Sequence, residues 1–211
     1  MKGVVFTGDR KVEFHDFPDP VPGPGEVIVE IKASGMCGTD LKYYRASSGS
    51  GGASAIGLSA KDGPVIAGHE PCGIVVAVGA GVDEKVAKLG MRAMQHHYRG
   101  CGACSHCSEG WAQLCIEGAD VYGATAHGAH APYMKCPAET IVPLPDELSF
   151  ATGAAISCGT GTAWGALQRL NLQGHQTIVI FGQGPVGLSA TQLATAMGAW
   201  VIAVDINENR L

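Results

Sequence analysis

The 211-residue sequence predicts a mostly β domain followed by the first part of an α/β domain. Three observations predict this order. Short runs of β-forming residues, separated by Gly and Pro, extend to about Val142. Small and apolar residues at helix-compatible spacing then occupy residues 150–170, directly after Ser149, a typical helix N-cap. Finally, a strand, a glycine-rich turn, a helix and a second strand form a β-α-β pattern.

The β-type runs are short and lie between turn-forming segments. The Pro- and Gly-rich segment at residues 18–25 predicts a stiff connector. The Ser- and Gly-rich segment at residues 47–57 predicts a flexible surface loop beside the active site. We expect strands at residues 3–6, 27–33, 73–78, 133–135 and 140–142.

Near residues 143–146 the pattern changes from short β-type runs to helix-compatible spacing, which predicts a domain boundary. We expect a first domain at 1–148 and a second at 149–211. The second domain should contain a strand at 177–181, a helix at about 185–197 and a strand at 200–204. A doubly wound dinucleotide-binding sheet has about six strands. We therefore expect this second domain to be incomplete.

Composition excludes several classes of protein. With 46% hydrophobic and 16% charged residues, the chain is expected to be globular. A net charge of -5 does not supply the basic surface that nucleic acid requires. No apolar run approaches the roughly 20 residues that span a bilayer, and the charged N-terminus is unlike a signal peptide. We expect a cytoplasmic protein, in which eight cysteines indicate metal binding or catalysis before disulfides.

Four of these cysteines are closely spaced in the string CGACSHCSEGWAQLC. Four thiolates can close tetrahedrally around zinc and leave no position for water, as in a structural site. Two disulfides, an iron–sulfur cluster and a thiol redox module are the alternatives. His106 lies within this segment, and we expect it to be solvated and not a ligand. The predicted structural ligands are Cys101, Cys104, Cys107 and Cys115.

A second set of candidate ligands is spread along the chain. It comprises Cys37 in GMCGTDL, His69 and Glu70 in AGHEPCG, and Cys158 in ISCGTGTAW. Two thiolates and one imidazole leave a fourth position on zinc for water or a substrate oxygen, which is what a catalytic zinc needs. Each residue alone is weak evidence, because a lone buried Cys is more often a small hydrophobe.

A third pattern predicts a dinucleotide site. Gly182, Gly184 and Gly187 follow the strand TIVIF and begin a helix, with Pro185 and Val186 between them. These glycines permit the turn, the approach of a pyrophosphate and close helix–strand packing. Asp205 ends the next strand about 20 residues further on, where a carboxylate binds ribose hydroxyls and repels a 2′-phosphate. The pattern therefore favours NAD over NADP, although Asp205 could simply end a strand.

These three patterns, in this order, resemble the zinc-dependent alcohol dehydrogenase family, the medium-chain dehydrogenases. The resemblance implies a GroES-like catalytic domain at 1–148 and the start of a Rossmann domain at 149–211. It implies that Cys37, His69 and Cys158 bind the catalytic zinc. Glu70 would lie beside the metal and can enter its coordination sphere in some relatives. Thr39 would hydrogen-bond the substrate oxygen and begin the proton relay.

The same resemblance implies an oxidoreductase that interconverts an alcohol and an aldehyde or ketone by hydride transfer to or from NAD. Lys42 stands where many relatives have a relay histidine, so the proton route stays open. Tyr43 and Trp164 either line the substrate pocket or belong to the core. Relatives form dimers or tetramers, so we expect a homo-oligomer. The alternative is a zinc-folded fragment that acts only with another chain.

Overall fold

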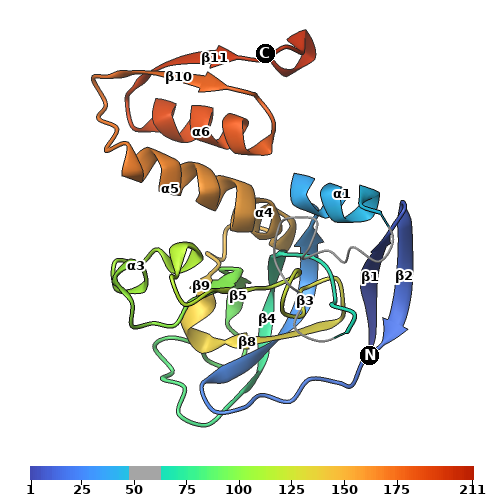
Figure 1. Cartoon of the computed structure of the whole chain (residues 1–211). Coiled ribbons are helices and arrows are strands. Elements are labelled where there is room, and N and C mark those ends of the chain that lie inside the picture. Colours follow the sequence, from blue (N-terminus) through green and yellow to red (C-terminus); the bar gives the residue numbers. More distant parts are fainter. Residues whose placement is uncertain (48–62) are drawn as a thin grey trace. The chain divides into compact units, whose positions relative to one another are not determined.

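The computed structural model describes residues 1–47 and 63–211, which form two compact units, Met1–Ser157 and Cys158–Leu211 (Figure 1). This division lies later than the predicted boundary at 148/149. Helix α4 (Phe150–Ala155) explains the difference, because it packs against β3 (Glu26–Gly35) and β4 (Glu70–Val78) of the first unit. All but the first residue of the predicted loop at 47–57 lie outside the described residues.

The first unit is built on a five-stranded antiparallel sheet in the order β8-β3-β4-β5-β9 (Figure 1). Its central strands are rich in β-branched residues, and Val27, Val29 and Val75 point into the core. Because both β3 and β4 are bonded on two sides, they give the sheet a rigid centre. The remaining strands are β5 (Arg92–Gln95), β8 (Tyr133–Pro137) and β9 (Ile141–Pro143).

A two-stranded sheet and one helix pack against each other in another part of the first unit. Strands β1 (Lys2–Gly8) and β2 (Lys11–Asp16) form an antiparallel hairpin whose turn holds Asp9 and Arg10 at positive φ. Helix α1 (Gly38–Arg45) contacts β1, and Phe6 and Tyr43 are buried together in one cluster. Tyr43 is therefore a core residue.

The cysteine-rich segment forms a separate lobe of the first unit. It contains the short helix α3 (Ser105–Ser108) and a 3-10 turn at Ala112–Leu114. The strands β6 (Tyr98–Arg99) and β7 (Asp120–Val121) pair with each other at the base of the lobe. A second 3-10 turn, Ala138–Thr140, joins β8 to β9.

The second unit begins in a π-helical turn, Ile156–Thr160, that follows α4 without a break and leads into helix α5 (Gly161–Arg169). Strand β10 (Thr177–Phe181), helix α6 (Pro185–Ala196) and strand β11 (Trp200–Val204) complete a parallel β-α-β unit. Both strands have the predicted bounds. The predicted helical region 150–170 is helical, but the π-helical turn divides it. A final 3-10 turn spans Glu208–Arg210.

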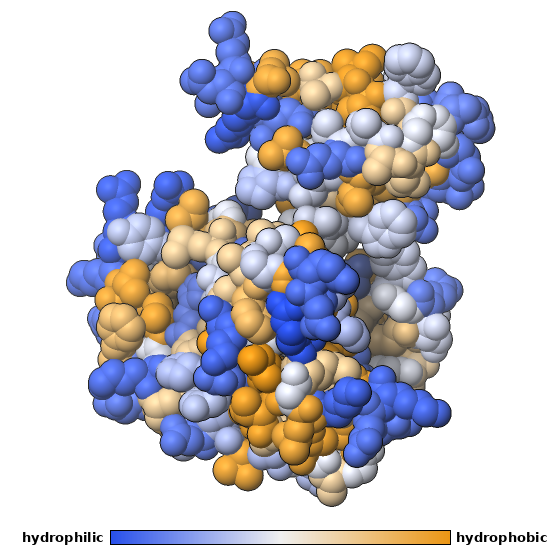
Figure 2. Space-filling model, turned by 180° about the vertical axis from the view of Figure 1, so that it is seen from behind, coloured by the Kyte–Doolittle hydropathy of each residue, from blue (hydrophilic) through white to orange (hydrophobic). Residues whose placement is uncertain are grey.

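The two faces of this small parallel sheet differ. Ile178 and Val201 pack with the cluster that contains α5 and α6 residues. The opposite face carries large apolar side chains that are strongly exposed, and Figure 2 shows apolar surface on this unit. The exposed residues include Phe181 at 79% and Trp200 at 74%. Among residues 1–47 and 63–211, no helix is long and apolar enough to cross a membrane.

Candidate metal centres and cofactor loop

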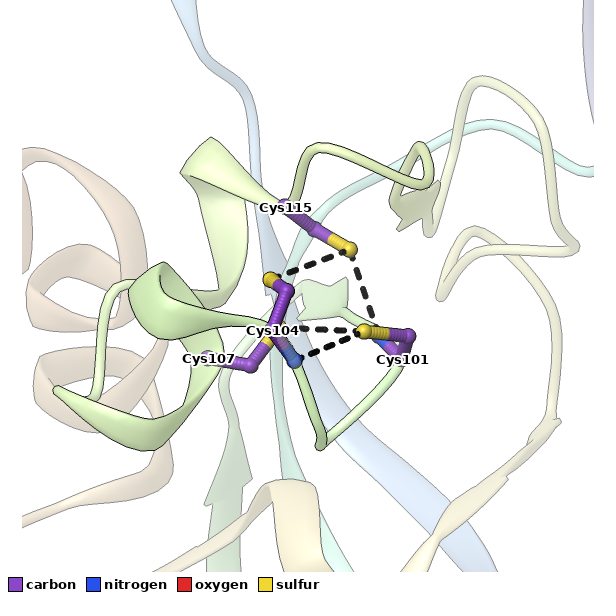
Figure 3. Close-up of side chains that lie close together, drawn as sticks. All are labelled: Cys101, Cys104, Cys107 and Cys115. Carbon is purple, nitrogen blue, oxygen red and sulfur yellow. Dashed lines mark hydrogen bonds between the residues drawn. The ribbon is translucent and has the colours of Figure 1, made fainter.

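The four closely spaced cysteines converge in the lobe, and Figure 3 shows their side chains turned toward one another. The four Sγ atoms all lie within 4.8 Å of one another. The Cys101 and Cys107 sulfurs are 4.0 Å apart, as are the Cys104 and Cys115 sulfurs. Four sulfurs in a tetrahedron around zinc, at about 2.3 Å each, would be separated by about 3.8 Å. The observed spacing therefore fits a four-thiolate metal site.

These sulfur separations are far longer than a disulfide bond of about 2.05 Å. None of the eight cysteines of the chain is in a disulfide. The alternative of two disulfides in the lobe is therefore contradicted by the structure. His106 is not among the ligand atoms that meet there.

Backbone amides prepare the lobe for negative sulfur. The Ala103 and Cys104 N–H groups donate to Cys101 Sγ at 3.4 and 3.3 Å. Amide donation from Cys107 and Ile116 lowers the pKa of Cys104 to about 6. Since a thiolate is the form that binds metal, these amides favour the ligating state of Cys101 and Cys104. At Cys107 a backbone hydrogen bond lowers the pKa, but desolvation and the neighbouring cysteine side chains outweigh it and raise the pKa to about 12. A side chain at Gly100 would come within 2.4 Å of Cys107 Sγ, so glycine is needed there.

The structure also brings Cys37 together with the adjacent pair His69 and Glu70, which lies far from it in the sequence. Their ligand atoms lie within 4.8 Å of one another. Cys37 directly precedes α1, while His69 precedes β4 and Glu70 begins it. His69 and Glu70 are buried, at 6% and 8% exposure. Three potential metal donors thus meet at the end of β3 and the start of β4.

Asp40 organises this cluster, and sequence reasoning missed it. Its side chain is fully buried, and its Oδ2 accepts a hydrogen bond from the Cys37 N–H at 2.7 Å. Its Oδ1 lies 3.3 Å from His69 Nδ1 as an ion pair, without the alignment of a hydrogen bond. With Nδ1 facing a carboxylate, Nε2 is left to bind metal, the arrangement typical of zinc-bound histidines. The signal was available in CGTD, where an acidic residue stands three positions after the helix N-cap.

The electrostatics of His69 reflect two opposing effects. Burial alone lowers its pKa, but the interactions with the Asp40 carboxylate and the Cys37 thiol outweigh burial and raise the pKa to about 10. The site therefore favours positive charge at the imidazole when no metal is bound. The ring of His97 packs 5.0 Å from that of His69. Burial is the main reason that the pKa of His97 is lowered to about 3.

A glycine makes room for Glu70. Gly35 is its partner across the β3–β4 ladder, and a Cβ on Gly35 would lie 2.1 Å from Glu70 Oε2. Thr39 lies in the first turn of α1, with its Oγ1 3.9 Å from Cys37 Sγ. Lys42 is exposed one turn further along the helix. Both residues are therefore on the helix that begins at the candidate ligand Cys37.

Cys158 is buried in the π-helical turn and is the first residue of the second unit. The turn continues directly from α4, and Ser157 Oγ donates to the Ala154 carbonyl at 2.9 Å. A π-helical insertion within a helix is a frequent feature of functional sites. Trp164, on α5 of the same unit, is 47% exposed.

The glycine-rich loop of the second unit has the geometry that its sequence predicts. Gly182 has φ of +85°, which only glycine adopts easily. A Cβ on Gly187 would lie 1.7 Å from the Gly182 carbonyl oxygen, so this glycine is required for close packing of α6. A Cβ on Gly184 would meet no atom of the described chain within 4 Å. Gly184 therefore has no packing role among the described residues, and it stands at the N-cap of α6.

Two polar side chains brace this loop. Asp205 Oδ2 accepts from the Gln183 N–H at 2.6 Å, and its Oδ1 accepts from the Asn207 N–H at 2.8 Å. These amide hydrogen bonds lower the pKa of Asp205. The buried Gln183 amide donates to the Ile180 carbonyl at 3.2 Å and accepts from Thr191 Oγ1 at 3.0 Å. Gln183 was not predicted, because a polar residue between two glycines gives no signal of burial.

The order of these sites along the chain can be compared with known proteins. The family model described as the alcohol dehydrogenase GroES-like domain matches residues 23–146. The chain belongs to the zinc-dependent alcohol dehydrogenase family. The five-stranded sheet and its cysteine lobe are therefore the GroES-like part of an alcohol dehydrogenase family member, followed by the first β-α-β unit of a Rossmann domain.

Three members of the alcohol dehydrogenase family illustrate the relationship. An uncharacterised zinc-type alcohol dehydrogenase-like protein of Escherichia coli is 36% identical over 100% of this chain and 59% of its own length. The sorbitol dehydrogenase of Bacillus subtilis is 35% identical, over 100% of this chain and 57% of its own. The structure of acetophenone reductase from Geotrichum candidum, in complex with NAD, is 33% identical with a TM-score of 0.82, over 99% and 59% of the two chains. This chain thus spans less than two thirds of the length of these relatives.

Proposed function

We propose that this chain provides the zinc and NAD sites of an oxidoreductase that interconverts an alcohol and an aldehyde or ketone. The meeting of Cys37, His69 and Glu70, with ligand atoms within 4.8 Å, carries this proposal. A thiolate, an imidazole and a carboxylate are the ligands that zinc prefers. The names of the relatives, which include dehydrogenases and a ketone reductase, support the same class of reaction.

In this proposal Cys37 Sγ, His69 Nε2 and Cys158 Sγ hold a catalytic zinc, and Glu70 is an alternative ligand. Cys158 is the third protein ligand because it is a buried thiol only three residues beyond α4, which packs against β3 and β4. Three protein ligands leave one position for an oxygen. When bound, zinc would supply a Lewis acid that polarises the oxygen of the substrate.

The residues around the ligands would orient and transfer protons. The Asp40 carboxylate, 3.3 Å from His69 Nδ1, would favour the tautomer with the proton on Nδ1 and leave Nε2 to bind the metal. The Thr39 hydroxyl, in the first turn of α1 beside Cys37, would accept the proton of the substrate hydroxyl and pass it on. The exposed Lys42 or water would carry it to solvent.

The second unit would bind NAD through the loop before α6. The N–H groups of Gly184, Val186 and Gly187 lie at the N-terminus of α6 and would bind the pyrophosphate. Pro185 has no N–H, and its fixed φ suits the first helical position. Asp205 would accept the ribose hydroxyls and exclude a 2′-phosphate. NAD, when bound, supplies the hydride acceptor or donor.

The cysteine lobe would hold a second, structural zinc with all four positions taken by Cys101, Cys104, Cys107 and Cys115. We further propose a cytoplasmic homo-oligomer, a dimer or tetramer, whose partner in catalysis is a small alcohol or carbonyl compound. Neither nucleic acid nor a membrane is part of this proposal.

The test is zinc-dependent formation of NADH from a panel of primary, secondary and polyhydric alcohols. We expect activity that a chelator removes and zinc restores, and that Cys37→Ser abolishes. Activity that survives Cys37→Ser would contradict the zinc mechanism. Calorimetry with NAD and with NADP tests the cofactor separately, and NAD should bind more tightly.

A second candidate function is that of a zinc-folded chain that acts only together with another chain. The exposed Phe181, Trp200 and Ile206 on the second unit favour it, because apolar surface of this kind is usually covered by a partner. Sedimentation distinguishes the two candidates. Association without NAD binding by the isolated chain would favour this second function.

A further inference from the structure

The first unit contains a pocket that shares no residue with the candidate metal centres or the glycine loop. Its volume is about 550 Å³, within the range of small-molecule sites. It lies between the segment that follows β2, the residues before His69 and strand β8. Its size and position mark it as a separate site.

The lining is mainly apolar and aromatic. Phe17, Ile66, Tyr122 and Met134 contribute to it. The rings of Phe17 and His127 meet edge to face, with centroids 5.0 Å apart. Flat aromatic ligands suit such walls, because further rings can pack edge to face or offset against them.

His127 provides a directed polar group in this apolar wall. Its Nδ1 accepts a hydrogen bond from the Ile66 N–H at 3.2 Å, so the neutral ring carries its proton on Nε2. Partial desolvation, with the nearby Lys135 charge, lowers the pKa of His127 and so favours the neutral ring. His127 lines the pocket and is an exposed residue, and its Nε2–H has no hydrogen-bond partner among the described residues, so it can donate to a ligand there.

The charged groups at the pocket compensate one another. Lys135 lies 3.4 Å from the Glu26 carboxylate, and the N-terminal ammonium of Met1 lies 2.8 Å from the Asp19 carboxylate. All four residues line the pocket. Two cations paired with two anions leave no net charge to attract an ion, so the pocket favours a neutral ligand.

We propose that this pocket binds a neutral, flat aromatic molecule that carries one acceptor oxygen, which accepts the hydrogen bond of His127 Nε2–H. The rings would occupy the apolar lining near Phe17 and Tyr122. The proposal does not depend on the zinc or NAD sites.

Methionine methyl groups report on this site without interference from the others. The chain has six methionines, of which Met1 and Met134 line the pocket. Met36 is next to the candidate ligand Cys37, and Met197 follows α6 in the second unit. With 13C-methyl methionine in the full chain, we expect coumarin to shift the Met1 and Met134 signals in a saturable manner. The Met36 and Met197 signals should stay in place.

Paired variants and paired ligands test the hydrogen bond. His127→Phe keeps an aromatic ring beside Phe17 and removes the donor. It should weaken coumarin binding by about tenfold and leave the binding of 2H-chromene, which lacks the carbonyl oxygen, unchanged. His15→Phe is the matched control, because His15 stacks on Phe17, with centroids 6.5 Å apart, but does not line the pocket. It should bind both compounds as the unaltered protein does.

Several outcomes would overturn the proposal. One is coumarin shifting Met36 or Met197 but neither Met1 nor Met134, and another is no saturable shift of any methionine. Equal loss of coumarin and chromene in His127→Phe would contradict the hydrogen bond. If that variant does not fold, the two ligands are compared on the unaltered protein. The proposal predicts that coumarin binds more tightly than 2H-chromene, and equal affinities would contradict it. Tighter binding of coumarin-3-carboxylate than of coumarin would contradict the preference for a neutral ligand.

Discussion

Asp40 links the backbone of Cys37 to the imidazole of His69 through one fully buried carboxylate. Asp40→Asn keeps the shape and the acceptor for the Cys37 N–H but removes the charge that faces Nδ1. Loss of such an outer partner typically lowers metal affinity about 10–100-fold. We expect a decrease of that size in zinc affinity, measured by competition with a chromophoric chelator.

Asp83→Asn is the matched control, because exposed Asp83 also accepts a backbone hydrogen bond, from the Lys85 N–H at 2.8 Å. It should leave zinc affinity unchanged. Equal affinities of the Asp40→Asn variant and the unaltered protein would show that His69 needs no carboxylate to bind metal.

His97 makes the stability of the first unit depend on pH. Its folded pKa of about 3 lies below the unfolded value of about 6.5. Between these values the unfolded chain binds a proton that the folded chain does not, so this contribution to stability is lost as pH falls below about 6.5. His97→Phe should reduce the loss by up to about 1.4 kcal/mol per pH unit.

Urea unfolding of zinc-saturated protein at pH 7.5, 6.5 and 5.5 measures this dependence. His175→Phe, at an exposed position of the second unit, serves as the control. If the free energy of unfolding depended on pH identically in His97→Phe and the unaltered protein, His97 would not be a cause of that dependence.

At the scale of elements, the cysteine lobe has little apolar core, because α3 and the Ala112–Leu114 turn contain no buried residue. We therefore expect its order to come from the proposed structural zinc. Chelation should raise the rate of cleavage by endoproteinase Glu-C at the exposed Glu109 and Glu117 by about tenfold or more. Cys107→Ser should behave as the chelated protein does.

Cleavage at exposed Glu84, in a turn outside the lobe, should not respond to the chelator. If Glu109 and Glu117 were equally protected with and without metal, the lobe would be ordered by something other than four thiolates.

In the glycine loop, Gly187 is needed for packing, whereas Gly184 is proposed to serve ligand binding. Gly187→Ala places a Cβ against the Gly182 carbonyl and should destabilise the second unit by about 1–3 kcal/mol. Gly184→Ala meets no described atom and has an ordinary φ of -75°, so stability should be retained. Both should weaken NAD binding, as calorimetry and urea unfolding can measure. Unaltered NAD binding in Gly184→Ala would contradict the proposed pyrophosphate site.

Some elements could be predicted from the sequence because their signals are local. β10 and β11 are continuous apolar runs bounded by turn residues, and the cysteine lobe places all four ligands within one short segment. β2 was not predicted, because Lys11–Asp16 is mostly exposed and is a strand only through its pairing with β1. The π-helical turn interrupts a sequence that reads as one continuous helix.

At the scale of the whole molecule, the second set of metal donors depends on the fold. Cys37 and His69 come together because β3 and β4 pair from Val27–Val78 to Gly35–Glu70. No local pattern encodes that pairing. Residue chemistry named these donors as candidate ligands, and the resemblance to a family added that they meet at one metal. Gly35 was missed for the same reason, because its role beside Glu70 exists only once the two strands pair. Asp40 and Gln183 bond within short segments, so their omission has the local causes given above.

The central claim is that Cys37 belongs to a metal site distinct from the cysteine lobe. Zinc content per chain, measured by mass spectrometry after removal of loosely bound metal, tests it most directly. We predict about two zinc ions in the unaltered protein and about one each in Cys37→Ser and Cys107→Ser, from the two proposed sites. A Cys37→Ser protein that retains as much zinc as the unaltered chain would contradict the account.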